Sequence, residues 1–348
     1  MLTPSAIKSR ASEIGFDLCG IAPAEALPQL ARFREWLARG YAGEMAYLAR
    51  TADQRTDPRL VLPGARSIIV TGTVYNTDRP YSTTRGAGQA RVARYAWGED
   101  YHDVIGKRQH LLLGWMKETV GEAFNAVAYV DTGPVHEKVF AERAGVGWVG
   151  KNTCLINQEL GSWIFLGVIL CSLELEPDAP AVDQCGRCRR CLDACPTGAL
   201  VEPYVLDATR CISYLTIEVR GAIPESQRRD VGEHVYGCDI CQDVCPWNRR
   251  APISTDRAWL PRTIFDQATT AELWDRPDRE LRAALKDSAM TRAGVRRLRR
   301  NLSVALGNSA DPTAEAALFN DDNRADSPSL MDSMVKEHVE WAKAGERG

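Results

Sequence analysis

The sequence predicts a multidomain α+β protein, and three observations indicate this fold class. Helical segments and short apolar, strand-like runs alternate through the first half of the chain, which is typical of an α/β layer. Closely spaced cysteines crowd the stretch from Cys185 to Pro246. Beyond that stretch, apolar residues recur at helical spacing. We therefore expect an α/β domain over residues 1–177, a cysteine-rich domain over 178–250 and a helical region over 251–348.

Composition and charge are those of an ordinary globular protein. The 348 residues are 45% hydrophobic and 26% charged, with a formal net charge of −3. Such a charge gives no general attraction to nucleic acid, so any basic surface must be local. The N-terminus lacks the apolar run of a signal peptide, and no stretch reaches the roughly 18 apolar residues of a membrane span. We expect a cytoplasmic monomer without membrane contacts, whose cysteines stay reduced.

Apolar periodicity and turn residues place the elements of the first domain. Gly15 ends the first helix, and the Pro63-Gly64 turn introduces a β-branched strand. A polar segment before the third helix contains Asp100-x-His102, followed by Gly106, one place too late for the pattern by which some cobalamin enzymes supply an axial histidine. We interpret His102 as a polar loop residue. The expected helices lie over residues 3–17, 28–38 and 105–120, and the expected strands over 17–22, 66–75 and 162–173.

Asp131 is the candidate catalytic residue of this domain. It ends an apolar strand over residues 126–131, and Pro134 suits the first turn of a following helix. Asp131 could face a ligand at the strand's carboxyl end, or it could simply cap that helix. A glycine run over 145–150 follows, and it could let the backbone approach a large ligand or could form a tight turn.

The cysteines have the spacing of ligands to two [4Fe–4S] clusters. In the first Cys-Pro motif, three thiolates can hold one cubane while the cysteine before proline points to the other cluster. The second motif departs from this pattern, because only Cys238 and Cys241 precede its Cys-Pro, and its third ligand would be Cys211 further upstream. Structural zinc and disulfides are the alternatives, but the tandem third and fourth cysteines favour iron–sulfur. Cys19, Cys154 and Cys171 lie outside these motifs, and we expect them to be buried and inert. Exchanging the fourth ligands gives Cys185, Cys188, Cys191 and Cys245 for the first cluster, and Cys195, Cys211, Cys238 and Cys241 for the second.

The helical region carries a local concentration of arginines. Val295, Leu298 and Leu302 line one face of a helix, and arginines project from its other faces. Such a patch could neutralise phosphates, or it could be a solvated face with Asp partners. A polar tail over 321–329 precedes a last helix over 330–344. The arginines are Arg292, Arg296, Arg297, Arg299 and Arg300.

With these motifs in order, nearly the whole chain resembles the epoxyqueuosine reductases. The resemblance rests on segments 129–135, 147–153, 211–218, 237–248 and 298–308, together with the first cysteine motif. It implies a cobalamin-binding domain of the nitroreductase and reductive-dehalogenase type, a double-cluster ferredoxin-like domain and HEAT-like helical repeats. It also implies the last step of queuosine biosynthesis, a two-electron deoxygenation of epoxyqueuosine at the wobble position of tRNA anticodons.

The resemblance also implies roles for particular residues. Cobalamin would be bound with its lower base detached and without a protein histidine as ligand, and an external donor would supply electrons through the clusters. Our mechanistic hypothesis is that a protonated Asp131, its pKa raised beneath the macrocycle, delivers a proton to the opening epoxide oxygen. The arginines at 292–300 would hold the anticodon stem-loop. The residues expected near cobalamin are Arg55, Tyr95, Asp131, Lys151, Asn152 and Ser213.

Two other classes of protein share some of these features. A plain electron-transfer protein would need only the clusters, whereas a long α/β domain precedes them here. A corrinoid dehalogenase acting on a small molecule would not require the arginine-rich helices. A cobalt signal would exclude the first class, and affinity for tRNA would exclude the second.

Overall fold

The computed structural model describes residues 2–27, 31–320 and 326–345. Its centre is a four-stranded sheet in the order β1-β2-β7-β4, and every neighbouring pair is antiparallel. The alternation of helices and strands was predicted correctly. The analogy of Asp131 to an open parallel sheet was wrong, because β4 pairs with β7 in the opposite direction. The strands are β1 (Leu18–Pro23), β2 (Ser67–Val74), β4 (Ala126–Tyr129) and β7 (Ile164–Cys171).

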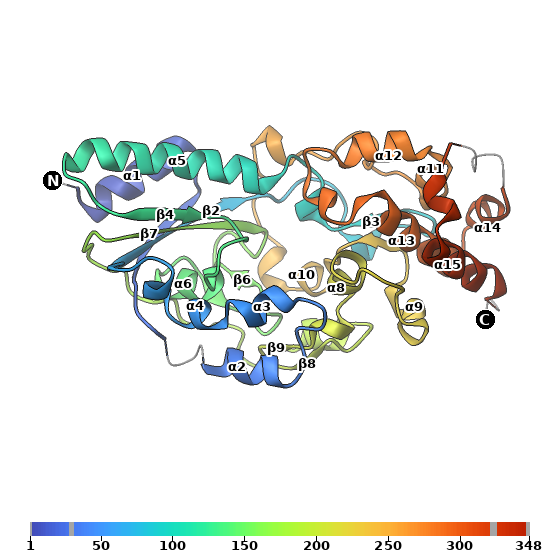
Figure 1. Ribbon diagram of the computed structural model, residues 1–348, viewed down its shortest axis with the longest axis horizontal. Helices are drawn as coiled ribbons and strands as arrows, with labels where there is room; N and C mark the ends of the chain where they lie inside the picture. The colour runs from blue at the N-terminus through green and yellow to red at the C-terminus, as the bar shows by residue number, and fades with distance from the viewer. Residues whose placement is uncertain (1, 28–30, 321–325, 346–348) are drawn as a thin grey trace.

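Apolar runs in the sequence explain why this sheet lies in the interior. All eight residues of β2 and all eight of β7 are buried, because helices cover both faces. Helices α1 (Pro4–Ile14) and α5 (Tyr101–Val120) lie on one face, and α6 (Glu137–Arg143) lies on the other (Figure 1). Three further helices lie on the α6 side: α2 (Ala31–Ala38), α3 (Ala46–Arg50) and α4 (Ala52–Thr56).

The chain after β4 differs from the sequence expectation. Asp131 has a left-handed backbone with φ of 59°, and helix α6 begins only at Glu137. Pro134 therefore lies in an irregular turn, and His136 occupies the N-cap position. Neither Asp131 nor Thr132 caps the helix, so the capping alternative is wrong.

The glycine run forms a tight hairpin. Strand β5 (Trp148–Val149) lies within the run and pairs with β6 (Leu155–Ile156), and Gly150 begins the turn between them. A methyl group on Gly147 would lie 2.4 Å from the Ile156 carbonyl oxygen, so only glycine permits this approach. The tight-turn alternative is confirmed.

The cysteine-rich part is built from short elements and is joined to the first part by a strand pair. Strand β3 (Arg91–Val92) pairs in parallel with β10 (His234–Tyr236). Ala90, Val92 and Trp97 consequently pack into the core of the helical region rather than into the sheet domain. The other elements are α7 (Arg190–Ala194), β8 (Leu200–Glu202), β9 (Val205–Leu206), α8 (Ile212–Ile217), α9 (Glu225–Val231) and α10 (Ile240–Asp243).

Helix α13 (Gly294–Asn308) is the axis of the helical region, and eleven of its fifteen residues are buried. Around it lie α11 (Thr270–Asp275), α12 (Asp278–Leu285), α14 (Pro312–Phe319) and α15 (Ser333–Ala344). Part of the polar tail, 321–325, and the start of the second helix, 28–30, lie outside the described residues. The HEAT-like repeat and the three domain bounds remain predictions. Within the described chain, no helix is both long and apolar enough to cross a membrane.

Candidate active site and cluster centres

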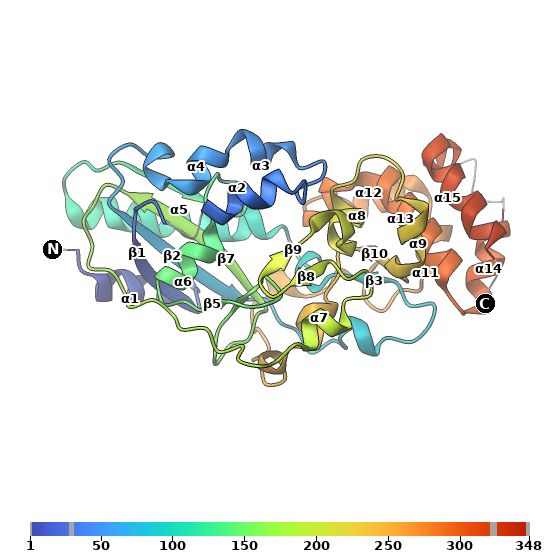
Figure 2. The same ribbon diagram turned by 90° about the horizontal axis from the view of Figure 1, so that it is seen from below.

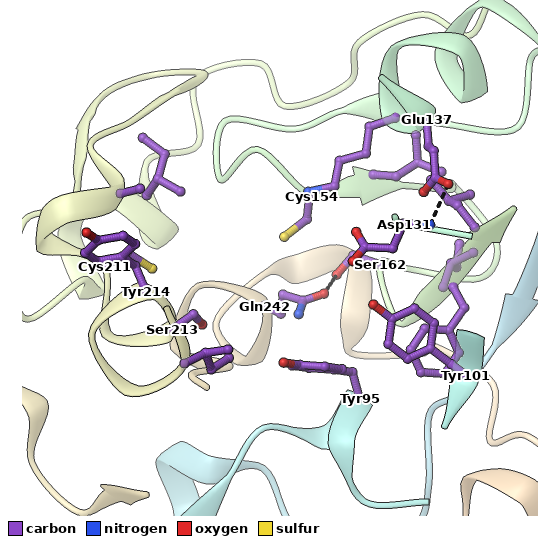
Figure 3. Close-up of a pocket in the computed structure, with 18 of the residues that line it drawn as sticks. Tyr95, Tyr101, Asp131, Glu137, Cys154, Ser162, Cys211, Ser213, Tyr214 and Gln242 are labelled. Atoms are coloured by element: carbon purple, nitrogen blue, oxygen red, sulfur yellow. Dashed lines mark hydrogen bonds between the residues drawn. The ribbon is translucent and has the colours of Figure 1, made fainter. Parts of the chain in front are cut away.

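A cavity of about 510 Å³ lies between the sheet domain and the cysteine-rich part, which contributes α8 to its lining. Tyr101 and Asp131 line one side, and Cys211 and Ser213 line the opposite side (Figure 3). Apolar groups from β7 and α8 cover much of its wall, including Phe165 and Ile217. The cavity therefore combines an apolar body with a few polar groups at defined points, as ligand sites do.

Asp131 projects into this cavity and is linked to a second acidic residue through His102. The Asp131 carboxylate lies 3.5 Å from His102 Nε2, and His102 Nδ1 lies 2.6 Å from the Asp100 carboxylate. Asp100 also caps helix α5, which fixes His102 in its first turn. His102 is therefore part of the site, and its interpretation as a loop residue was wrong.

This arrangement determines which group holds a proton. Burial tends to lower the pKa of His102, but hydrogen bonds to Asp100 and Asp131 raise it to about 9. Burial tends to raise the pKa of Asp131, yet the hydrogen bond and charge of His102 bring it below its ordinary value. These shifts favour a proton on His102 over one on Asp131 in the protein alone, and the rise in the pKa of Asp131 expected beneath cobalamin stays a prediction.

Glu137 holds the unusual backbone of the Asp131 loop. Its Oε1 accepts a hydrogen bond of 2.7 Å from the Asp131 backbone N–H (Figure 3). Burial and the neighbouring Asp131 charge raise the pKa of Glu137 to about 8. Glu137 is thus mostly protonated at neutral pH and adds little repulsion to Asp131.

The residues expected near cobalamin fall into three groups. Tyr95, Asp131 and Ser213 line the central cavity. Arg55 lines an adjoining cavity of about 570 Å³, which also contains His102 and shares Tyr95, Tyr101 and Asp131 with the first. Lys151 and Asn152 lie instead beside the first cysteine set.

The first cysteine set surrounds a cavity of its own. Cys185, Cys188, Cys191 and Cys245 line about 250 Å³. Lys151 Nζ donates to the carbonyls of Gly186 and Cys188 at 2.5 and 3.0 Å, which fixes the cysteine loop. The backbone of Cys245 is extended, with ψ of 125°, as a residue before proline requires.

The second set adjoins the central cavity. Burial raises the pKa of Cys238 well above its usual range, and the nearby Cys211 and Cys195 raise it further. Cys241 interacts with Cys238 and Cys211, so these four thiols are neighbours although Cys211 lies far from Cys238 in sequence. Among the described residues, no three Cys, His or carboxylate side chains converge as they would on a single ion. A cubane needs wider spacing because each sulfur binds a different iron.

Cys154 is not an inert core thiol. It lines the central cavity and contacts Cys241, while Cys171 is buried as expected. Its position could not be foreseen from its apolar sequence neighbours, because the contact crosses from the β5–β6 hairpin to α10.

The arginine helix differs most from expectation. Arg299 and Arg300 are fully buried, so they do not project from α13 and cannot contact phosphates. Arg299 pairs with Asp278 and donates to the carbonyls of Trp274 and Arg276 at the end of α11. Arg300 donates to the carbonyls of Leu215, Val219 and Gly221 at and beyond the end of α8. They thus satisfy backbone carbonyls that helix ends leave unpaired.

The other three arginines lie nearer the surface. Arg297 donates to the carbonyls of Ala293 and Ile217. Arg292 pairs with Glu218 and Arg296 with Asp332, and the two arginine side chains are 49% and 52% exposed. Arg292 lines the cavity that contains Arg55, and Arg296 lines a neighbouring one with Arg282 and Lys286. Arg282 and Lys286 had not been predicted, because α12 shows no arginine run.

Comparisons with known proteins agree with this geometry. Residues 184–248 match the 4Fe-4S double cluster binding domain family, and residues 55–132 match the family "Epoxyqueuosine reductase QueG, DUF1730". The chain is 47% identical to epoxyqueuosine reductase of Gloeobacter violaceus, over 90% of this chain and 99% of the relative. It is 43% identical to epoxyqueuosine reductase of Pseudomonas aeruginosa, over 97% of this chain and 92% of the relative. A crystal structure of epoxyqueuosine reductase with an epoxyqueuosine-modified tRNA-Tyr stem loop superposes with a TM-score of 0.83, at 30% identity over 97% of each chain.

Proposed function

The chain belongs to the epoxyqueuosine reductase family, and we infer that its central cavity is where the epoxide is reduced. The reaction converts epoxyqueuosine in tRNA to queuosine. It adds two electrons and two protons, the epoxide carbons become an alkene, and the oxygen leaves as water. The protein must therefore deliver electrons and protons to one point. We place the modified base at the wobble position of an anticodon stem-loop.

Two [4Fe–4S] clusters fit the two cysteine sets. The first set surrounds its own cavity, and Cys211 of the second lines the central cavity. Backbone N–H groups approach the ligand sulfurs, as Ala199 N–H does to Cys195 Sγ at 3.3 Å, and such bonds tune cluster potential. Electrons would pass from the first cluster to the second and then to the cavity.

Cobalamin fits the central cavity and its neighbour. Their shared lining, which includes Tyr95, Tyr101 and Asp131, offers aromatic walls and one carboxylate to a large, flat group. His102 lines the neighbouring cavity, but its two ring nitrogens face the Asp100 and Asp131 carboxylates, which suits a cobalamin without a protein histidine ligand. Tyr95 and Ser213 in the central cavity and Arg55 in the adjoining one would hold it. When bound, cobalamin supplies a cobalt centre that accepts single electrons and delivers two to the substrate.

The proton comes from the chain's own residues. Asp131 faces the cavity, and His102 behind it carries a proton at neutral pH. As negative charge develops on the epoxide oxygen, the proton of His102 passes through the Asp131 carboxylate to that oxygen, and the second proton that water formation needs enters from solvent. Asp100 keeps the His102 ring in the orientation for this transfer. The Tyr101 ring stacks on the Phe165 ring with 4.5 Å between the ring centroids, and it forms the cavity wall beside Asp131 and His102.

A basic strip beside the cavity suits the tRNA backbone. Arg292 lines the cavity next to the centre, and Arg282, Lys286 and Arg296 line the next one along α12 and α13. Arg282 and Lys286 are exposed and have no ion-pair partner among the described residues. These four cations replace the buried arginines as proposed phosphate contacts.

The observation that carries this function is the placement of Asp131 and Cys211 on opposite sides of one cavity. Anaerobic protein with two clusters, a chemical reductant, cobalamin and epoxyqueuosine-containing tRNA should yield queuosine by nucleoside mass spectrometry. Omission of cobalamin should abolish the product. Cobalamin-independent turnover would contradict this proposal for the cavity.

Asp131→Asn removes the acid but keeps its size. We expect a loss of turnover of roughly 100-fold or more, which is the usual contribution of general acid catalysis. Iron content and cobalamin binding should be unchanged, as measured by iron analysis and by the corrin absorption spectrum. Full turnover by this variant would remove Asp131 from the mechanism.

A further inference from the structure

The loop that carries the first cysteine set is also a basic surface. Arg187, Arg189 and Arg190 are interleaved with Cys188 and Cys191, and all three are exposed. Arg189 has a loose partner in Asp193 at 3.7 Å, while Arg187 and Arg190 have no ion-pair partner among the described residues. The protein as a whole is weakly acidic, with a net charge of −3, so this local excess of positive charge is a distinct feature.

The surroundings of these arginines are suited to protein contact. Val182 is 76% exposed and Tyr204 is 41% exposed. The Tyr204 hydroxyl donates to Asp183, which also accepts from the Cys185 backbone N–H, so the tyrosine is fixed next to the loop and Asp183 is engaged. A small patch with apolar side chains and unpaired cations is typical of a transient protein interface.

The position of the loop relates this surface to electron entry. The first cysteine set adjoins the exposed loop, whereas the second adjoins the central cavity through Cys211. Helix α7 of this loop lies near the lower edge of the molecule in Figure 2. Electron transfer slows steeply with distance, so an incoming carrier must approach the cluster nearest the surface.

We propose that the Arg187–Arg190 loop, with Val182 and Tyr204, is the docking surface for an acidic protein that carries one electron at low potential. This rests on the proposed assignment of Cys185, Cys188, Cys191 and Cys245 to the outer cluster. Each docking event passes one electron, so the carrier loses one electron and the cluster is reduced from [4Fe–4S]²⁺ to [4Fe–4S]⁺. No bond or proton changes, and two events supply one turnover. The opposite charges steer the encounter and make its rate depend on salt.

The test uses the oxidised holoenzyme without tRNA and a prereduced plant-type [2Fe–2S] ferredoxin, an acidic one-electron carrier of low potential. Stopped-flow absorbance follows cluster reduction at low and high salt. The wild-type rate constant should fall about tenfold or more with salt. Arg187→Glu combined with Arg189→Glu should lower the low-salt rate at least tenfold and flatten its salt dependence. Lys107→Glu with Lys117→Glu, exposed positions on α5, should behave as wild type.

Two controls separate docking from cluster loss. Iron content and complete reduction by excess dithionite should be the same in all variants, and a deficit in the wild type itself would count against the cluster assignment instead. Should the double Glu variant lose iron, Arg187→Gln with Arg189→Gln removes the charge without reversing it and is expected to lower the rate at least threefold. A salt-independent wild-type rate, or variants with full iron reduced as fast as wild type, would overturn the proposal.

Discussion

The contact between His102 and Asp131 shows how position sets the chemistry of a single carboxyl group. An isolated Asp beneath an apolar ligand would gain a proton through desolvation. Here His102, itself held by Asp100, lowers the pKa of Asp131, so that Asp131 favours its ionised form. The proton is then bound to His102, one hydrogen bond away from Asp131. The sequence could indicate Asp131 as an acid, but it could not show that His102 rather than Asp131 binds the proton. The two residues come together only when the loop after β4 meets the start of α5.

His102→Gln should change the pH dependence of turnover. The wild-type rate should fall as pH rises through about 9, where His102 loses its proton. Glutamine cannot carry that proton, so Asp131 must bind it directly. We expect about a tenfold loss at pH 7.5 and a rate that rises toward acid pH. Single-turnover assays from pH 5.5 to 9.5 would measure this, and a profile identical to wild type would exclude His102 from the proton path.

The same pair affects stability with a defined sign. Folding raises the pKa of His102 from its ordinary 6.5 to about 9, so the folded protein binds the proton more tightly than the unfolded chain. This stabilisation is complete below pH 6.5 and is lost as pH rises through about 9. The lowered pKa of Asp131 also stabilises the folded protein, and this stabilisation is lost only as the pH falls into the acid range where Asp131 becomes protonated.

At the scale of the element, α13 is a structural support and only secondarily a basic surface. Its buried arginines donate to the backbone carbonyls at the ends of α8 and α11. Asn301 donates to the carbonyls of Thr216 and Val235 at 2.8 Å each. The helix thereby holds the segment that begins with Cys211 and Ser213. Helical periodicity predicted α13 correctly but could not separate the buried from the exposed arginines, because their carbonyl partners lie in other elements.

Arg299→Met tests this role. Removing the guanidinium leaves the buried Asp278 carboxylate and two carbonyls with fewer partners, so the free energy of unfolding should fall by about 3–5 kcal/mol. Arg296→Met, three residues earlier on the exposed side, should cost at most about 1 kcal/mol. Urea unfolding monitored by circular dichroism would compare the two. Equal, small effects would contradict the supporting role of Arg299.

At the scale of the whole molecule, the three structural parts do not correspond to three consecutive segments of the chain. Strand β3 comes from the sheet domain in sequence but pairs with β10, and Trp97 packs in the helical core. The strands β2 and β7 and the cysteine motifs were predictable from local patterns. The antiparallel order, the Asp131 turn and the β3–β10 pairing were not, because they depend on contacts between segments distant in sequence. Cytoplasmic location and a monomeric state remain predictions.

The basic strip beside the cavity should govern affinity for tRNA. Arg282→Glu combined with Arg296→Glu should raise the Kd for the tRNA stem-loop at least tenfold. It should also reduce the slope of log Kd against log salt by about one for each phosphate that the variant no longer neutralises. Fluorescence anisotropy at several salt concentrations would measure both. Arg187→Glu with Arg189→Glu, on the distant cysteine loop, should leave Kd and slope unchanged. An unaltered slope in the first variant would place the tRNA elsewhere.

Two cysteine quartets that lead from an exposed loop to the Asp131 cavity are the basis of the proposed reaction, and iron analysis tests them most directly. Anaerobically purified protein should contain about eight irons per chain, as two cubanes require. Cys188→Ser should lower this to about four and leave the low-temperature EPR signal of the inner cluster. Fewer than about six irons in the wild-type protein, or loss of all iron on changing Cys188 alone, would contradict two independent clusters.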